Sequence, residues 1–366
     1  MADFRVVRRP LELMAQAYQD HIQAWELRLA SQDTNRVARE FEWGEEWSRL
    51  WSLGEAGERS ANGDPGEAVR RAAQAATQAS DQFYAYRTPT DFRLHGGTNS
   101  ASSFVLRFTS AVQTPSEENN RVSALWFPAP GRTTKAVVVL PQWNSKIPQH
   151  VGLCRMLRLL GISALRLSLP YHDERMPPEL ERADYAVSSN VGRTVNAARQ
   201  AVIDTRSCLD WLESQGCRRL GIVGTSLGSC YAFLASAHDT RLRANVFVLY
   251  SYYFADVVWN GLSTRHIREK LNGQIELKHL QEAWMPITPQ SYTERYIGQA
   301  KKSLLISTAY DTTFLPEYSQ PMVAEFRRRG ADFEELVLPC GHYTLGQSPF
   351  RLIAGQRICS YLERWL

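Results

Sequence analysis

Residues 218–239 read RRLGIVGTSLGSCYAFLASAHD and contain the turn that decides the fold. The apolar run that ends at Val223 has the length and composition of a buried strand, and the run that follows Gly228 has those of a helix. Ser226 therefore stands in a tight turn between the two, in a GxSxG pattern whose glycines avoid the clash that side chains would cause. This context predicts a serine hydroxyl at the carboxyl edge of a sheet, beside the Leu227 amide at the start of a helix.

The sequence around this turn alternates between strands and helices. Short, almost continuous apolar runs recur, and amphipathic stretches of helical length separate most of them. The predicted strands are 102–110, 119–127, 135–140, 163–169, 218–224, 244–253 and 302–308. We therefore expect an α/β fold with a mostly parallel sheet that is covered by helices on both faces.

Residues 10–30 predict an amphipathic helix, because large apolar side chains recur there at intervals of three and four residues. These side chains are Leu11, Met14, Tyr18, Ile22, Trp25 and Leu29. Three tryptophans then recur at every fourth position and predict a packing face; they are Trp43, Trp47 and Trp51. A second helix is predicted at about 67–83.

These segments define the expected domain organisation. Residues 1–85 form a helical N-terminal extension, and residues 86–366 form the α/β domain. The stretch 254–297 is too long and too helical for an ordinary connection between two strands. We interpret it as a small cap inserted into the α/β domain.

The composition excludes several classes of protein. The 366 residues are 44% hydrophobic and 22% charged, which is typical of a folded globular protein and not of a disordered or fibrous one. The 42 basic and 38 acidic residues leave a net charge of +4 without a basic stripe, so nucleic acid is not an expected partner. No apolar stretch reaches the roughly 20 residues of a membrane span, and the N-terminus does not resemble a signal peptide. The sequence thus predicts a cytoplasmic protein without a membrane span.

The six cysteines give no sign of a metal site. They are scattered along the chain, without a CxxC pair or a histidine at the spacing of metal ligands. They are Cys154, Cys208, Cys217, Cys230, Cys340 and Cys359. We therefore expect buried, reduced thiols and no bound metal.

A serine hydroxyl is a poor nucleophile near neutral pH, so Ser226 requires a histidine base and an acid that orients the base. Both residue types follow later predicted strands. Asp311 follows the strand KSLLIST in the sequence AYDTTF, and His342 follows FEELVLP in the sequence CGHYTLG. The chain order is therefore serine, aspartate, histidine, with each side chain in a loop after a strand.

This arrangement resembles the α/β-hydrolase superfamily, with GTSLG as the nucleophile elbow, YDTTF bearing the acid and CGHYTLG bearing the base. The resemblance covers about residues 90–366. In its general sequence pattern, the chain is most similar to the dienelactone-hydrolase-like and acetylxylan-esterase-like branch. It implies an α/β-hydrolase fold and a serine hydrolase in which His342, oriented by Asp311, activates Ser226. The resemblance also implies an acyl-serine intermediate and no metal or organic cofactor.

Two other residues compete for roles in this triad. His172, in LPYHDERMPP, also follows a predicted strand, but His342 has the chain-order position of the base, and we expect His172 to line the pocket. Asp256 follows an earlier strand and is the alternative acid, although Asp311 has the expected position one strand before the histidine. The remaining histidines are interpreted as surface or capping residues: His21, His95, His150, His238, His266 and His279.

The oxyanion hole needs a second backbone donor besides Leu227, and the loop after strand 135–140 should supply it. This loop reads LPQWNSK and differs from the HG or HGGG pattern familiar in the superfamily. Because Pro141 has no amide hydrogen, the donor is Gln142 or Trp143, and the register favours Trp143.

Aromatic residues at strand ends and in the cap predict an apolar pocket, which favours uncharged esters over charged phosphoryl groups. The predicted substrate-binding residues are Gln142, Tyr171, His172, Tyr252 and Tyr253. Arg175 and Arg265 are interpreted as solvated surface residues and not as carboxylate ligands.

We therefore predict a carboxylesterase that acts on a small-molecule ester. A peptidase or a thioesterase would use the same triad, because the pocket decides which leaving group is accepted. A hydrolase-fold binding protein without turnover is the alternative from another class, and transfer of the acyl group to an alcohol is a third. Residues 1–85 are expected to contact the cap or a second subunit, and the second case makes the protein a homo-oligomer.

Overall fold

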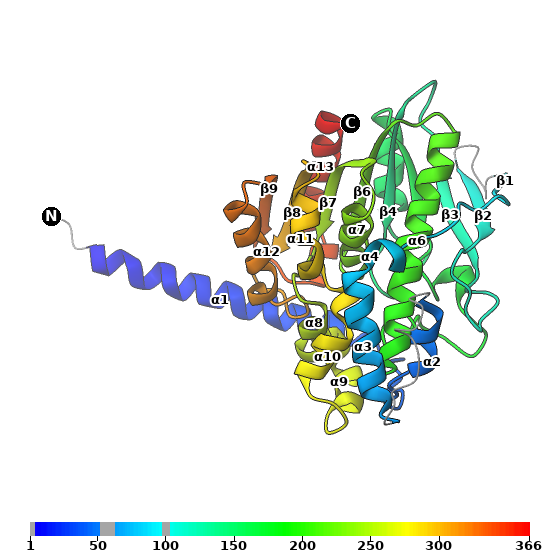
Figure 1. The fold of residues 1–366 in the computed structure, drawn as a ribbon. Helices are drawn as coiled ribbons and strands as arrows, with labels where there is room; N and C mark the ends of the chain where they lie inside the picture. The colour runs from blue at the N-terminus through cyan, green and yellow to red at the C-terminus, as the bar shows by residue number, and fades with distance from the viewer. Residues whose placement is uncertain (1–3, 52–62, 97–102) are drawn as a thin grey trace.

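The computed structural model describes residues 4–51, 63–96 and 103–366. The described residues form a nine-stranded sheet with the order β1-β2-β3-β5-β4-β6-β7-β8-β9 (Figure 1). The strands are β1 (Arg93–His95), β2 (Phe104–Thr109), β3 (Arg121–Phe127), β4 (Lys135–Leu140), β5 (Ser163–Leu167), β6 (Arg219–Thr225), β7 (Leu242–Val248), β8 (Lys302–Thr308) and β9 (Asp332–Leu338).

Most of the sheet is parallel, as the sequence predicts. Strands β5, β4, β6, β7, β8 and β9 run in one direction, and β1, β2 and β3 extend the sheet in antiparallel pairs. The carboxyl ends of β6, β8 and β9 therefore lie at the same edge of the sheet. The loops that follow these three strands contain Ser226, Asp311 and His342.

Alternation along the strands divides the core between the two faces of the sheet. Val137 and Val139 of β4 pack with α5 and α13 on one face, whereas Val138 and Leu140 pack with α6, α7 and α12 on the other. These helices are α5 (Val151–Leu159), α6 (Val191–Ser214), α7 (Leu227–Ala237), α12 (Pro316–Arg328) and α13 (Phe350–Trp365). Burial on both faces explains why the strands are almost continuously apolar.

The N-terminal residues form helices that pack on this body. They are α1 (Phe4–Ala30), α2 (Glu45–Ser48), η1 (Arg49–Trp51), α3 (Pro65–Gln78) and α4 (Ser80–Phe83). Asp64 caps α3 by accepting two amide hydrogens, and the single helix expected at 67–83 is divided at Ala79. Trp51 is fully buried with its ring 5.7 Å from that of Phe83. In Figure 1, α1 (blue) begins away from the body and reaches it with its carboxyl end.

The connection between β7 and β8 is helical, and its residues 254–297 are those for which the sequence predicts a cap; we use this name for them below. Its elements are α8 (Phe254–Asn260), η4 (Leu262–Thr264), α9 (Arg265–Leu271), α10 (Leu277–Ala283), η5 (Met285–Ile287), η6 (Pro289–Tyr292) and α11 (Thr293–Ile297). Helix α10 packs against α3, and the indole of buried Trp284 donates to the carbonyl of Val191 in α6 at 3.1 Å. Among the helices of the described residues, none is long and apolar enough to cross a membrane.

Candidate active site

The turn after β6 holds Ser226 in a strained conformation. Its φ of 54° and ψ of −121° lie in a region that residues other than glycine rarely adopt. The flanking glycines permit close contacts: a Cβ at Gly224 would lie 2.2 Å from the carbonyl oxygen of Gly228, and one at Gly228 would lie 2.4 Å from that of Leu140. The Ser226 amide also donates to the carbonyl of Val248 at 2.8 Å. The turn is therefore fixed between β4 and β7, the two neighbours of β6.

The structure brings together the three residues predicted to form a triad. Ser226 Oγ lies 3.0 Å from His342 Nε2, and His342 Nδ1 lies 3.0 and 3.1 Å from the two carboxylate oxygens of Asp311. A carboxylate only accepts hydrogen bonds, so Nδ1 bears the hydrogen and Nε2 accepts from the serine hydroxyl. This geometry suits a hydroxyl that a histidine deprotonates while a carboxylate orients the histidine.

Asp311 is held by its own loop. One carboxylate oxygen accepts hydrogen bonds from the amides of Thr313 and Phe314 at 2.8 and 2.7 Å, and the other accepts from the Thr308 hydroxyl at 3.2 Å. The side chain is only 3% exposed. These contacts fix the carboxylate where His342 requires it.

The environment of His342 favours its protonated form. Burial alone lowers the pKa of His342, but the charge and hydrogen bond of Asp311 and the charge of Glu26 outweigh burial and raise this pKa above the usual 6.5. The imidazole also stacks on the Phe314 ring, with centroids 5.2 Å apart. The charged form of the imidazole is thus stabilised.

His172 supports the loop after β4 and does not contact Ser226. Its Nε2 lies 2.9 Å from the amide nitrogen of Asn144, and its Nδ1 lies 2.8 Å from the carbonyl oxygen of Pro170. Nε2 therefore accepts and Nδ1 donates, which requires a neutral ring. Burial lowers the pKa of His172 to about 4. Because the Asn144 amide is already bonded, the second oxyanion donor predicted in this loop remains Gln142 or Trp143.

The side chain of Trp143 joins the loop after β4 to the cap. Its indole donates to the carbonyl of Ala183 at 2.9 Å, and its ring stacks on His266 of α9 with centroids 5.9 Å apart. The guanidinium of Arg182 lies 5.6 Å from the centre of the same ring. The interpretation of His266 as a surface or capping residue is wrong, because α9 packs this side chain against Trp143 and buries it.

The other predicted substrate-binding residues differ in accessibility. Tyr171 and His172 are each 1% exposed, so neither side chain is presented to a substrate in this conformation. Tyr252 is buried, whereas Gln142 and Tyr253 are half-buried. Tyr252 and Tyr253 pack ring against ring in the segment that enters the cap, with centroids 5.1 Å apart.

Two polar residues have environments that the sequence did not indicate. Arg175, interpreted as a surface residue, is completely buried and pairs with Asp204 at 2.7 Å, because the packing of α6 on the sheet encloses both side chains. Asp256, the alternative acid, lies on α8, where its carboxylate accepts from Gln281 at 3.0 and 3.1 Å. The histidine Nδ1 is bonded to Asp311 and not to Asp256.

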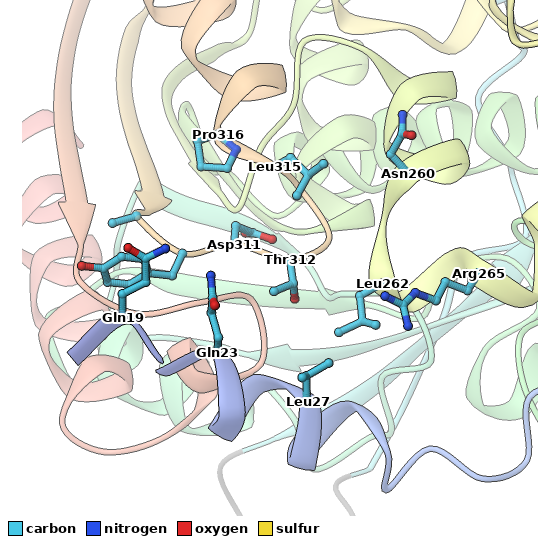
Figure 2. A pocket seen from close by; sticks show the side chains of 12 residues that line it. Gln19, Gln23, Leu27, Asn260, Leu262, Arg265, Asp311, Thr312, Leu315 and Pro316 are labelled. Atoms are coloured by element: carbon cyan, nitrogen blue, oxygen red, sulfur yellow. The ribbon is translucent and has the colours of Figure 1, made fainter. Parts of the chain in front are cut away.

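A pocket of about 380 Å³ lies between α1 and the loop that contains Asp311. Figure 2 shows Gln19, Gln23 and Leu27 of α1 near Asp311 and Thr312 of the loop. Neither Ser226 nor His342 lines this pocket. The pocket therefore lies where α1 meets the loop that contains Asp311, and it does not include the serine hydroxyl.

Sequence reasoning missed Glu26, which is completely buried on α1. Its carboxylate accepts hydrogen bonds from the amides of Tyr343 and Thr344, immediately after His342. The sequence spacing places Glu26 on the same helix face as the apolar residues Tyr18 and Ile22, because the three follow one another at intervals of four residues. This spacing could have indicated that Glu26 is buried. A carboxylate on the apolar face of a helix needs a partner inside the protein.

Comparisons with known proteins agree on the architecture. Acetyl xylan esterase 1 from Thermoanaerobacterium sp. JW/SL YS485 is similar with a TM-score of 0.58 and 13% identity, over 88% of this chain and 99% of that chain. Acetyl xylan esterase from Paenibacillus sp. R4 is similar with a TM-score of 0.54 and 14% identity, over 87% of this chain and 99% of that chain. The chain has the α/β-hydrolase fold.

A longer α/β-hydrolase shares part of this structure. The acylaminoacyl peptidase from Pyrococcus horikoshii is similar with a TM-score of 0.55 and 12% identity, over 75% of this chain but only 42% of that chain. No family model matches the sequence, and no curated protein matches it. At these identities the likeness establishes the fold, and the chemistry is argued from the residues of this chain.

Proposed function

We propose that the protein is a serine hydrolase that cleaves carboxylic esters through an acyl-serine intermediate on Ser226. The observation that supports this best is the continuous hydrogen-bonded series from Ser226 Oγ through His342 to Asp311, with both links at 3.0 Å. The esterases among the structural neighbours support hydrolysis at the level of the fold. An amide or a thioester is the alternative substrate of the same triad.

The proposed reaction begins with transfer of the Ser226 proton to His342 Nε2 as Oγ attacks the carbonyl carbon. Asp311 stabilises the imidazolium that forms. The Leu227 amide donates a hydrogen bond to the negatively charged former carbonyl oxygen. This amide has no acceptor within α7 because Leu227 is the first residue of that helix. The amide of Trp143 or Gln142 is the second donor.

Collapse of this intermediate completes acylation and prepares hydrolysis. His342 returns its proton to the leaving alcohol, and the carbonyl carbon stays bonded to Ser226 Oγ as an ester. Water then enters, and His342 removes one of its protons as the water oxygen attacks the acyl carbon. The bond between this carbon and Ser226 Oγ then breaks, His342 returns the proton to Oγ, and the carboxylic acid leaves. Each step uses only groups of this chain and water.

The surroundings of the triad favour a small uncharged acyl group. Ser226 is 6% exposed, so the protein encloses most of this residue. Trp143 stacked on His266 provides an aromatic surface next to the proposed oxyanion amides. Burial lowers the pKa of His266 to about 4, so the His266 ring is neutral near pH 7. We therefore propose short acyl esters as substrates.

A fluorophosphonate probe combined with p-nitrophenyl esters of increasing acyl length tests the proposed function. The natural protein should be labelled and should hydrolyse the short esters fastest, whereas Ser226→Ala and His342→Ala should lose both properties. Ser291→Ala, at an exposed serine of the cap, is the matched control and should react like the natural protein. A folded natural protein that resists the probe and hydrolyses no ester, amide or thioester contradicts the proposal.

A further inference from the structure

One face of α1 contacts the loop that contains His342. The Tyr18 hydroxyl donates to the carbonyl of Pro339 at 2.6 Å, and Ile22, one turn later, is buried in the core beneath the same loop. Glu26 is one further turn along and is 0% exposed. A buried carboxylate is costly unless hydrogen bonds replace its lost water, so the contacts of Glu26 are important for the fold of this region.

The Glu26 carboxylate connects two loops: the loop that contains His342, called the base loop below, and the loop that contains Asp311, called the acid loop. Its two oxygens accept from the amides of Tyr343 and Thr344 at 3.0 and 2.6 Å, and one of them also accepts from the Thr312 hydroxyl at 3.3 Å. Tyr343 follows His342 in the chain, and Thr312 follows Asp311. A single side chain of the N-terminal helix thus holds the residues next to both members of the hydrogen-bonded pair.

The base loop wraps closely around this carboxylate. A Cβ at Gly341 would lie 2.4 Å from Glu26 Cδ and 2.6 Å from Glu26 Cγ. Only glycine therefore lets the backbone at 341 approach the side chain so closely. His342 stands between Gly341, which packs on the carboxyl group, and Tyr343, whose amide is bonded to it.

From these contacts we propose that Glu26 is a positioning residue, which holds the His342 loop and the Asp311 loop in the geometry that the triad requires. This proposal rests on the serine-hydrolase function proposed above. Glu26 acts through the two loops and does not touch the substrate. Misplacement of a reacting group by about 1 Å can cost on the order of 100-fold in rate, so the contacts of one buried carboxylate are sufficient for a large effect.

Glu26→Gln tests the proposal with the smallest change of shape. A glutamine amide has one acceptor oxygen and one donor group, so one of the two loop amides loses its acceptor. We expect kcat for a short p-nitrophenyl ester to fall about tenfold or more while KM changes by less than about twofold. Arg28→Gln, at an exposed residue of the same helix, is the control and should leave kcat unchanged.

The pH profile separates positioning from a purely structural role. The groups that face His342 and its loop are the carboxylates of Asp311 and Glu26, the Cys340 thiol, the Tyr18 phenol, and the Tyr343 phenol, which is bonded to Arg36 and lies near Asp33. Burial raises the pKa of the Cys340 thiol to about 12 and raises those of Tyr18 and Tyr343 above their usual value, so these three groups are neutral near pH 7. Because the charge of Glu26 raises the pKa of His342, Glu26→Gln should move the acid limb of kcat/KM to lower pH.

Thr312→Val is a second variant for the case in which Glu26→Gln does not fold, as judged by circular dichroism. It removes the hydroxyl bond to Glu26 but leaves the two amide donors of the carboxylate, and we expect kcat to fall about threefold with an unchanged KM. If folded Glu26→Gln keeps the kcat and the acid limb of the natural enzyme, or if it is unfolded and Thr312→Val keeps kcat, the proposal is wrong. A natural protein that resists the fluorophosphonate and hydrolyses nothing refutes the proposed function itself, and the positioning role with it.

Discussion

The Nε2 atom of His172 accepts the amide hydrogen of Asn144 at 2.9 Å. This bond fixes the loop after β4 at the residue that follows the proposed oxyanion donors. It also shows why a histidine at a strand end need not act as a base: both ring nitrogens are occupied, since Nδ1 donates to Pro170. The role of His172 is to hold a neighbouring backbone segment.

Replacement of His172 by phenylalanine should impair catalysis through this loop. The half-buried Asn144 amide loses its acceptor, which costs up to about 1–3 kcal/mol, and the loop is expected to shift. We predict a decrease of about tenfold in kcat and a lower Tm, while fluorophosphonate labelling is slowed and not abolished. His95→Ala, at an exposed position of β1, should change neither value. An unchanged kcat in folded His172→Phe would show that the loop does not contribute to the oxyanion hole.

Asp311→Asn and Asp256→Asn form a matched pair for the identity of the acid. An asparagine at 311 no longer stabilises the imidazolium and can hold His342 in the wrong tautomer, so we expect kcat to fall on the order of 1,000-fold. Asp256→Asn should keep kcat within about twofold, because its carboxylate contacts Gln281 in the cap. Steady-state kinetics of both variants with the same ester decide between them, and the opposite ranking would assign the acid role to Asp256.

Gly228→Ala should distort the turn that contains Ser226. The added Cβ would lie 2.4 Å from the carbonyl oxygens of both Leu140 and Pro141, so α7 or the loop after β4 must move. We expect a loss of about 2 kcal/mol or more in the free energy of unfolding and a fall in kcat. Gly355→Ala in α13, where a Cβ meets nothing within 4 Å, should instead stabilise the protein by about 1 kcal/mol. Urea unfolding of the two variants measures both effects.

Buried histidines predict that stability decreases as the solution becomes mildly acidic. Burial lowers the pKa of four histidines to about 4, and they are His150, His172, His238 and His266. Their folded-state pKa is below the unfolded value of 6.5, so the stability they contribute is complete above about pH 6.5 and is lost as the pH falls toward 4. Each contributes a slope of up to about 1.4 kcal/mol per pH unit in this window.

Urea unfolding between about pH 7 and pH 5 at constant ionic strength measures this slope. His342 acts in the opposite direction above about pH 6.5, because its pKa is raised and its contribution is lost as the pH rises through the folded value. Below about pH 6.5 that contribution is complete, so the slope toward pH 5 reports the four buried histidines. His266→Gln removes one of the four histidines and should therefore reduce the slope by up to about 1.4 kcal/mol per pH unit. A free energy of unfolding that is the same at both ends of this range contradicts the prediction.

The sequence predicted the fold because its signals are local. The serine turn depends on glycines within two residues of Ser226, and each buried strand is visible as a short apolar run. Asp311 and His342 could be selected because parallel strands bring their carboxyl ends to one edge, so residues that follow different strands meet there. Their hydrogen-bonded geometry is set by the side-chain contacts of the folded loops, and the sequence contains no measure of it.

The features that the sequence prediction missed depend on packing between distant segments. Glu26 contacts Tyr343 across 317 residues, and on a helix a lone glutamate is most often a solvated surface residue. His266 and Arg175 were assigned to the surface for the same reason, because only the packing of the cap and of α6 reveals that they are buried. Such residues become recognisable when a polar side chain interrupts an apolar face, as Glu26 does after Ile22.

The long separation between Glu26 and the base loop has a consequence for synthesis on the ribosome. Ser226 and the whole of α1 leave the ribosome before residues 341–344 are made. Until that loop arrives, the nucleophile has no base and the Glu26 carboxylate has neither backbone donor. By the proposed mechanism, the nascent chain cannot hydrolyse an ester before residues 341–344 have been made and have folded against Ser226 and Glu26.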